Sequence, residues 1–144
     1  IQAAILLAKL EFFDSEIIKR QKLGDYYSKK LNSIGIKKTP YILPKNTSVF
    51  AQYTILINKR DSFQEDLKSK GIPTAVHYPT ILPLQPALNF SSNLEEEKNL
   101  FKNAYFASQK VLSLPFHPWL KKSEINYIVD HIEKVLINDS SYLI

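Results

Sequence analysis

The order of elements in this protein is set by residues 49–79, which read VFAQYTILINKRDSFQEDLKSKGIPTAVHYP. Residues 49–57 alternate two sets of side chains, which is the pattern of a β-strand with two different faces. Residues 74–78 predict a second strand, and Pro79 ends it because proline has no N–H group to donate to a sheet. The residues between these strands have a helical pattern, so the stretch predicts strand, helix, strand.

The helix in the middle of this stretch has signals at both of its ends. Asp61 is an N-cap residue type, and Gln64, three residues later, can complete a capping box. Phe63 and Leu67 are four residues apart and would share the inner side of the helix. Gly71 is expected to end the helix, because glycine adopts the left-handed conformation that closes helices.

Towards the N-terminus, residues 1–31 form one long helical pattern. Its apolar stripe is Ala3, Leu6, Leu10, Phe13, Ile17, Tyr27 and Leu31. The first three turns are apolar almost all round, because Ile5, Leu7 and Ala8 lie off that stripe. Such a helix is either covered by polypeptide that is absent from this sequence or is an ordinary central core helix, and the pattern leaves both interpretations open. The sequence contains no methionine, so we expect it to be part of a longer polypeptide.

Towards the C-terminus, Asn93 is expected to cap a helix that runs to about Gln109, and residues 111–114 predict a short strand. Ser123 is expected to cap the last helix. Its apolar stripe is Ile125, Ile128, Val129, Ile132, Val135 and Leu136. Strands interleaved with helices predict an α+β fold, in which a small antiparallel sheet packs with helices and a long N-terminal helix, as a single domain over residues 1–144.

The composition excludes several classes of protein. The formal net charge is +5, but the lysines are scattered and only two arginines are present, so we expect no nucleic-acid partner. No apolar run is long enough to span a membrane, so we expect no membrane partner. The absence of cysteine excludes disulfides and thiolate metal sites and is compatible with a cytoplasmic location, which we expect.

Few side chains suggest a self-contained active site. The three histidines, His77, His117 and His131, are not spaced as metal ligands, and the three glycines are too far apart for a phosphate-binding loop. The exception is His77-Tyr78, at the end of a predicted strand and before Pro79. Because the proline interrupts the strand, both side chains could reach one cleft, where imidazole and phenol can bind phosphate or sugar oxygens. The alternative is a half-buried tyrosine beside a histidine with purely structural contacts.

Several segments resemble the C-terminal part of DegT-type sugar aminotransferases, in order and spacing, across nearly all of the chain. They are Ile1-Gln2-Ala3-Ala4-Ile5-Leu6, Arg20-Gln21-Lys22, Tyr26-Tyr27, Ala51-Gln52-Tyr53-Thr54, Gly71-Ile72-Pro73-Thr74-Ala75-Val76-His77-Tyr78-Pro79, Leu84-Gln85-Pro86-Ala87 and Leu112-Ser113-Leu114-Pro115. The resemblance implies the C-terminal small domain of a fold-type I transferase that uses pyridoxal 5'-phosphate (PLP) as a homodimer. It also implies that the Schiff-base lysine belongs to an N-terminal PLP-binding domain absent from this chain.

The resemblance assigns substrate-binding roles to His77, Tyr78 and Gln85, and it assigns no catalytic residue, because none of the lysines here lies in the family's lysine motif. The residues that bind the cofactor stay unknown, and no metal is expected. Two positions depart from the family pattern, since Pro83 stands where many members have histidine and Leu88 where they have an aromatic residue. These departures leave the identity of the sugar open.

The function implied is transfer of an amino group, commonly from glutamate, to a nucleotide-linked keto-sugar during synthesis of a surface polysaccharide or glycan. Among family members, the chain is most similar to enzymes that aminate UDP-linked 3-keto sugars, including uronic acids. Two alternatives are a stand-alone nucleotide-sugar-binding module and a non-catalytic, regulatory member of the family. An upstream domain that contains the cofactor lysine would distinguish the first interpretation from both alternatives.

Overall fold

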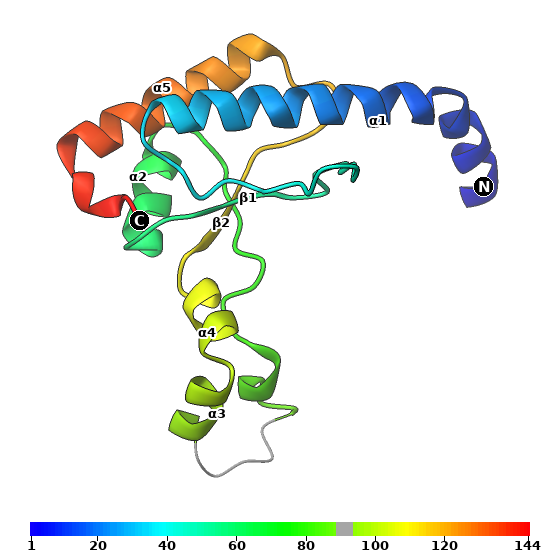
Figure 1. Ribbon diagram of the computed structural model, residues 1–144. Coiled ribbons are helices and arrows are strands. Elements are labelled where there is room, and N and C mark those ends of the chain that lie inside the picture. Colours follow the sequence, from blue (N-terminus) through cyan, green and yellow to red (C-terminus); the bar gives the residue numbers. More distant parts are fainter. Residues whose placement is uncertain (89–93) are drawn as a thin grey trace.

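A computed structural model of the chain describes residues 1–88 and 94–144. The longest element is α1 (Gln2–Ser33), and α5 (Lys122–Asn138) lies along its C-terminal half (Figure 1). Below these helices lies an antiparallel sheet of two strands, β1 (Tyr53–Leu56) and β2 (Val111–Leu114). The predicted α+β class, the small antiparallel sheet and the long first helix are therefore confirmed. No helix in the described part of the chain is long and apolar enough to cross a membrane.

The core forms where α1, the sheet, α2 (Arg60–Ser69) and α5 meet. Tyr27 of α1 stacks on Tyr53 of β1, with ring centroids 4.6 Å apart and ring planes at 15°. From α2, the predicted inner residues Phe63 and Leu67 are fully buried. The apolar stripe predicted for the last helix is buried at all six positions: Ile125, Ile128, Val129, Ile132, Val135 and Leu136. The short turn η2 (Ser140–Tyr142) then brings Tyr142 edge-on to Phe63, with centroids 5.0 Å apart.

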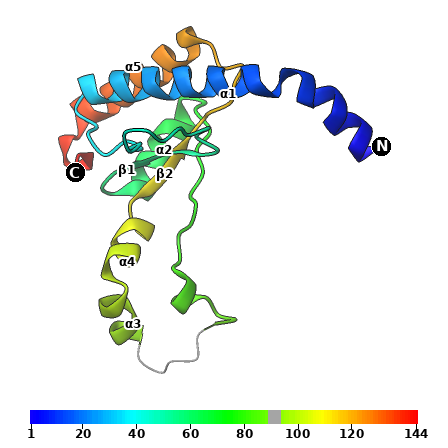
Figure 2. The same cartoon turned by 45° about the vertical axis from the view of Figure 1, so that its right-hand side comes forward.

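The N-terminal half of α1 extends beyond this body (Figures 1 and 2). Ile5, Leu6, Leu7 and Leu10 are all more than half exposed there. The interpretation of residues 1–31 as an ordinary core helix is therefore wrong for the first turns, which the described residues leave exposed. Full burial in α1 begins at Gly24, and of the predicted stripe residues before it, Ile17 is half-buried and the other four are exposed.

An arm projects from the other side of the sheet and consists of η1 (Leu82–Leu84), α3 (Leu94–Leu100) and α4 (Lys102–Ser108) (Figure 2). The single helix predicted up to Gln109 is wrong, since the helix is interrupted at Phe101, where φ is −106° and ψ is 37°. Glu95, Glu96 and Glu97 lie in the first turn of α3 as expected. The predicted cap, Asn93, lies outside the described residues.

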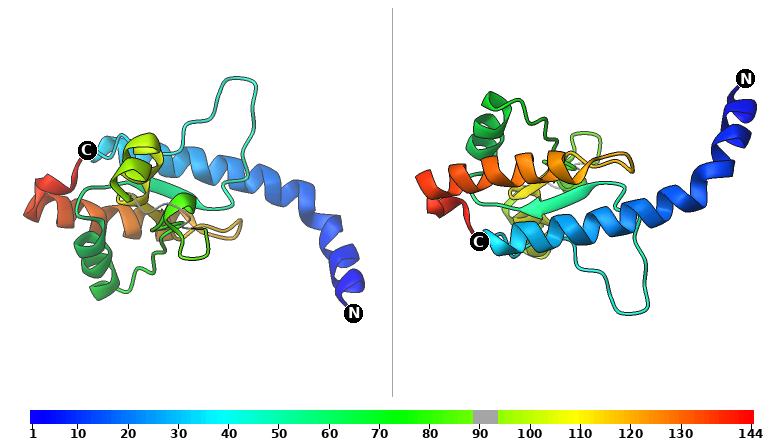
Figure 3. Two further views of the ribbon diagram at one scale, coloured as in Figure 1. Left: turned by 90° about the horizontal axis from the view of Figure 1, so that it is seen from below. Right: turned by 90° about the horizontal axis from the view of Figure 1, so that it is seen from above.

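Both predicted strands in residues 49–79 are shorter than expected. Phe50 has a φ of 45°, a value that cannot continue a strand, and its ring packs so closely on α1 that a Cβ atom on Gly24 would lie 2.3 Å from it. The chain between α1 and β1 therefore forms a projecting loop (Figure 3), and β1 begins only at Tyr53. In the predicted strand 74–78, only Ala75 pairs, in an isolated bridge to Ser113. Packing of the Phe50 ring in the core thus outweighs the alternating pattern.

The predicted N-terminal caps of α2 and α5 are also wrong, whereas Gly71 closes α2 in the left-handed conformation, with φ 72°, as expected. Lys59, in the left-handed conformation with φ 46°, precedes α2, so Asp61 lies inside the first turn and its carboxylate instead accepts a bond from Arg60 Nε at 2.8 Å. Gln64 donates to Thr74 rather than to the helix N-terminus. At α5, Lys121 precedes the helix and its N–H group donates to the Glu124 carboxylate at 2.7 Å, which leaves Ser123 inside the first turn.

Candidate substrate-binding site

His77, Tyr78 and Gln85, the three residues predicted to bind substrate, line one hollow of about 780 Å³. One wall is the segment that runs from His77 through η1 to Gln85, and the other wall is α4 with the start of β2. The lining residues are His77, Tyr78, Thr80, Ile81, Leu82, Pro83, Gln85, Phe101, Ala104, Ala107, Ser108 and Val111. Residues far apart in the sequence therefore form one concave surface at the base of the arm.

His77 and Tyr78 reach this hollow because the chain leaves the sheet directly after Ala75. The bridge between Ala75 and Ser113 holds the segment against β2, with N···O distances of 3.1 and 2.8 Å. The His77–Tyr78 peptide bond is cis, and the two rings stand edge to face with centroids 5.5 Å apart and planes at 90°. His77 is half-buried, whereas Tyr78 is 69% exposed. The expectation that both side chains reach one cleft is met.

Gln85 closes the loop that carries these residues. Its Nε2 atom donates to the backbone oxygen of Thr80 at 3.2 Å, and its side chain is half-buried. Pro83, one of the two departures from the family pattern, lines the same hollow, while Leu88 is 47% exposed and does not line it. Because the proline side chain has no hydrogen-bonding group, Pro83 adds only apolar surface to the hollow.

The lining of the hollow is mostly apolar, and several hydrogen-bonding side chains lie on the wall opposite α4. Phe101, Ala104 and Ala107 contribute carbon surface, and His77 and Gln85 contribute hydrogen-bonding groups. None of the described residues that line the hollow is Asp, Glu, Lys or Arg. Such a surface recognises a ligand by shape, ring stacking and hydrogen bonds, as small-molecule sites commonly do.

One polar contact of this site was missed at the level of sequence. The Ser113 hydroxyl lies 3.0 Å from Nδ1 of His77 and 2.9 Å from Oγ1 of Thr54, and Ser113 is only 5% exposed. The available signal was a serine inside the otherwise apolar strand 111–114. A polar residue at a core position of a strand requires a partner, and this one has two.

The hollow does not fit PLP by itself. A Schiff base with PLP requires a lysine, and no described residue that lines the hollow is one. Among residues 1–88 and 94–144, no group of three or more histidine, cysteine or acidic side chains could hold a metal ion. The arrangement can therefore bind and orient a ligand, but it has no group to anchor the cofactor.

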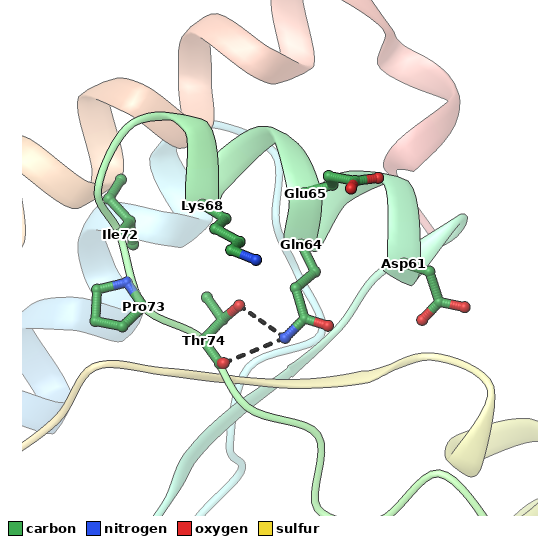
Figure 4. Close-up of a pocket in the computed structure, with 7 residues that line it drawn as sticks. All are labelled: Asp61, Gln64, Glu65, Lys68, Ile72, Pro73 and Thr74. Carbon is green, nitrogen blue, oxygen red and sulfur yellow. Dashed lines mark hydrogen bonds between the residues drawn. The ribbon is translucent and has the colours of Figure 1, made fainter.

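A second hollow, of about 650 Å³, lies between α2 and the segment 72–74 (Figure 4). Gln64 spans it and donates to the backbone oxygen of Thr74 at 3.2 Å and to its hydroxyl at 3.0 Å. Asp61 and Glu65 point away from these bonds along the exposed side of α2. None of the predicted substrate-binding residues lines this hollow. The Gln64 amide within it already donates to Thr74.

Comparison with known proteins gives a consistent result over almost the whole chain. Residues 1–133 match the DegT/DnrJ/EryC1/StrS aminotransferase family. The chain is 45% identical over 128 residues to UDP-2-acetamido-2-deoxy-3-oxo-D-glucuronate aminotransferase of Pseudomonas aeruginosa. That match covers 89% of this chain and 34% of the relative. It is 37% identical over 134 residues to a Geobacillus stearothermophilus protein named pleiotropic regulatory protein. That match covers 92% of this chain and 35% of the relative.

Solved structures agree with this match. The Streptomyces venezuelae protein DesV, solved in complex with a ketimine intermediate, superposes with a TM-score of 0.81 at 28% identity over 93% of this chain and 35% of that one. A Brucella abortus aminotransferase superposes with a TM-score of 0.77 at 30% identity and the same coverage. This chain spans about a third of the length of these relatives. Over that length, the chain belongs to the DegT/DnrJ/EryC1/StrS aminotransferase family.

Proposed function

We propose that this chain is the C-terminal part of a PLP-dependent aminotransferase that transfers an amino group, from glutamate, to a UDP-linked keto-sugar. The observation that carries the proposal is that His77, Tyr78 and Gln85 line one hollow in a chain that is 45% identical to an aminotransferase acting on a UDP-linked 3-oxo-glucuronate. The product would serve synthesis of a cell-surface polysaccharide or glycan in the cytoplasm.

In this proposal the chain supplies binding groups rather than the reacting ones. Tyr78 is exposed enough to stack on a flat or ring-shaped part of the nucleotide-sugar, and His77 is positioned to bond one of its oxygens. The apolar side of α4 would exclude water from the far side of the ligand. PLP and its lysine would come from an N-terminal domain outside this sequence, since none of the described residues that line the hollow is a lysine.

The complete protein would be a homodimer without a nucleic-acid or membrane partner. The exposed apolar half of α1, including Leu6, Leu7 and Leu10, would be covered by the N-terminal domain and the region of the dimer partner near it. Contiguous apolar surface of this kind marks sites of association in soluble proteins. The solvent-exposed first turns of α1 support this assembly.

A second candidate function is regulation without catalysis. It is favoured by one observation, the 37% identity to the G. stearothermophilus protein named as a pleiotropic regulator. A module of that kind would keep the nucleotide-sugar surface and lose the transfer reaction. The two candidates differ in whether the complete protein converts a UDP-linked keto-sugar to an amino sugar in the presence of glutamate and PLP.

The test of the binding site uses titration calorimetry of the chain with UDP-glucuronate. His77→Ala and Tyr78→Ala should each weaken binding by roughly tenfold, because each removes one hydrogen bond or stacking contact. The matched control is His131→Ala, since His131 lies on α5 and bonds the backbone oxygen of Tyr127. Unchanged affinity in both site variants would show that His77 and Tyr78 do not bind the ligand.

A further inference from the structure

The sheet has a second face, opposite the one that packs in the core. Tyr53 and Ile55 of β1 are fully buried in the core. Successive side chains of a strand point to opposite faces, so Thr54, between them, points to the outer face, where its hydroxyl contacts that of Ser113. The bridge from Ala75 to Ser113 adds a third segment to this sheet. The outer face therefore carries side chains from three separate parts of the sequence.

A hollow of about 320 Å³, here called the sheet-face hollow, is formed by these three segments. It is lined by Ala51, Gln52, Pro73, Thr74, Ala75, His77, Ser113, Leu114, Pro115 and Phe116. Its volume lies within the range of about 300–1,000 Å³ that is usual for small-molecule sites. Among the described residues, His77 alone also lines the hollow that contains Tyr78 and Gln85. The two hollows are therefore adjacent, and a ligand in contact with His77 can extend into both.

Two side chains give the sheet-face hollow its chemical character. Gln52 directly precedes β1, is exposed and forms no hydrogen bond with a described residue, so its amide can both donate to and accept from a ligand. Phe116 is half-buried, and its ring centroid lies 5.8 Å from that of Phe50 and 5.6 Å from that of Tyr53. These contacts hold the Phe116 ring in place. The hollow thus combines a free amide with a fixed apolar ring.

This combination suits the ring of a sugar, which has C–H groups on its faces and hydroxyl groups around its edge. The C–H groups can pack on an aromatic ring, and each hydroxyl can donate to or accept from an amide. None of the described residues that line the sheet-face hollow is Asp, Glu, Lys or Arg. Phosphate groups are bound most strongly by arginine and lysine, so the hollow favours the uncharged, hydroxyl-bearing part of a ligand over its phosphates.

We propose that the sheet-face hollow is a subsite for the sugar ring of the ligand and that Gln52 is a further binding residue within it. The sugar ring contacts Gln52 and Phe116, and the remainder of the ligand extends past His77 towards Tyr78. That the sugar is linked to a nucleotide rests on the proposed function, whereas a subsite for a neutral sugar ring does not require it. Gln52 then contributes to the choice among sugars, because an amide left unpaired by a missing hydroxyl lowers affinity.

The experiment follows the Gln52 side-chain amide by NMR of the nitrogen-15-labelled chain, during separate titrations with methyl β-glucoside and UDP-glucuronate. Methyl β-glucoside is a neutral sugar without a nucleotide, so it tests the subsite alone. Both ligands should shift the Gln52 signals, and Gln52→Ala should weaken each by about fivefold, since one hydrogen bond is lost. The variant should fold, because the Gln52 side chain is exposed. The matched control is Gln2→Ala, since Gln2 is exposed on α1 and lines neither hollow.

A second variant, Gln52→Glu, keeps nearly the same shape and still accepts bonds from sugar hydroxyls, but it adds a negative charge. It should change the affinity for methyl β-glucoside by less than about twofold and weaken UDP-glucuronate by about tenfold, because like charges repel. No response of Gln52 to methyl β-glucoside would overturn the proposal, as would UDP-glucuronate binding that shifts Tyr78 but not Gln52. If methyl β-glucoside shifts Gln52 but UDP-glucuronate does not bind, the proposed function alone is contradicted.

Discussion

Two tyrosines at the centre of the core have the same surroundings but different hydrogen bonding. Tyr27 and Tyr53 are both fully buried and stacked, and the Tyr53 hydroxyl contacts the Ser28 hydroxyl at 2.6 Å. The Tyr27 hydroxyl has no partner among the residues that the structure describes. A buried hydroxyl without a partner destabilises the folded state, so the two phenols should respond differently to the same substitution.

We expect Tyr27→Phe to leave the free energy of unfolding unchanged or to raise it by up to about 1 kcal/mol, because it removes an unbonded buried hydroxyl. Tyr53→Phe should lower the free energy of unfolding by about 1 kcal/mol, because Ser28 loses its partner. Urea unfolding of both variants measures the difference. A larger loss in Tyr27→Phe than in Tyr53→Phe would indicate that the Tyr27 hydroxyl has a partner such as a buried water.

The same pair predicts how stability depends on alkaline pH. Burial raises the pKa of Tyr53 from 10.0 to about 12, and burial followed by the neighbouring Tyr53 raises the pKa of Tyr27 even further. The folded state therefore holds both protons more tightly than the unfolded chain does. This contribution to stability is fully present below pH 10 and is lost as the pH rises from about 10 towards 12. The urea midpoint should fall over that interval, and it should fall less in Tyr27→Phe.

At the level of single residues, the sequence predicted the candidate side chains but not the residues that hydrogen-bond to them. His77, Tyr78 and Gln85 could be named because their residue types and order match a family motif, and they do share a hollow. Ser113 was missed because its contact with His77 spans 36 positions in the sequence. No local pattern reports a contact that exists only when two distant segments lie side by side.

Among the elements, the C-terminal end of α4 is hydrogen-bonded to a side chain from α2. The Arg60 guanidinium donates from Nη1 to the backbone oxygen of Ser108, at the C-terminal end of α4, at 2.6 Å. Its Nε atom bonds Asp61 at 2.8 Å, and the Arg60 side chain is only 10% exposed. Because α4 forms one wall of the hollow, this contact links the body of the molecule to the candidate site.

We expect Arg60→Ala to lower the free energy of unfolding by about 1.5–3 kcal/mol, the usual range for a hydrogen bond that involves a charged group. Hydrogen exchange should increase in α4 more than in α5, since the last turn of α4 loses its partner. Arg60→Lys should recover only part of the loss, because one amine cannot reproduce the guanidinium fork. The control is Asp61→Asn, which changes an 82% exposed side chain and should have little effect. Equal protection of α4 in Arg60→Ala and the unmodified chain would contradict this role.

The existence of most elements was predictable, and so were the bounds of β2, whereas the start of β1 and the N-terminal caps of α2 and α5 were not. The stripe of α5 and the inner residues of α2 were predicted because helical periodicity depends on near neighbours in the sequence. The start of β1 was not, because Phe50 adopts a φ of 45° to place its ring on Gly24, far away in the sequence. The caps were wrong for a similar reason, since Asp61 and Gln64 bond Arg60 and Thr74 rather than the helix end.

For the whole molecule, the main prediction concerns the cofactor. Incubation of the chain with PLP followed by borohydride reduction should give no stable adduct at a single lysine, because no lysine lines the described hollow. Peptide mass analysis measures the outcome. The positive control is the full-length P. aeruginosa aminotransferase to which the chain is 45% identical, treated in the same way. A quantitative adduct at one defined lysine of this chain would show that it anchors the cofactor itself.

The sequence by itself determined the α+β class, the long first helix and the family, because residue periodicity and motif order are properties of the chain read in one dimension. It also indicated that the first turns of α1 require a covering surface, since they are apolar on every side. Only the tertiary structure decided that Ser113 joins His77 to Thr54, that Arg60 bonds the end of α4, and that β1 is shorter than its pattern. Each of these depends on the packing of distant segments, where burying one aromatic ring or satisfying one buried hydroxyl outweighs local preference.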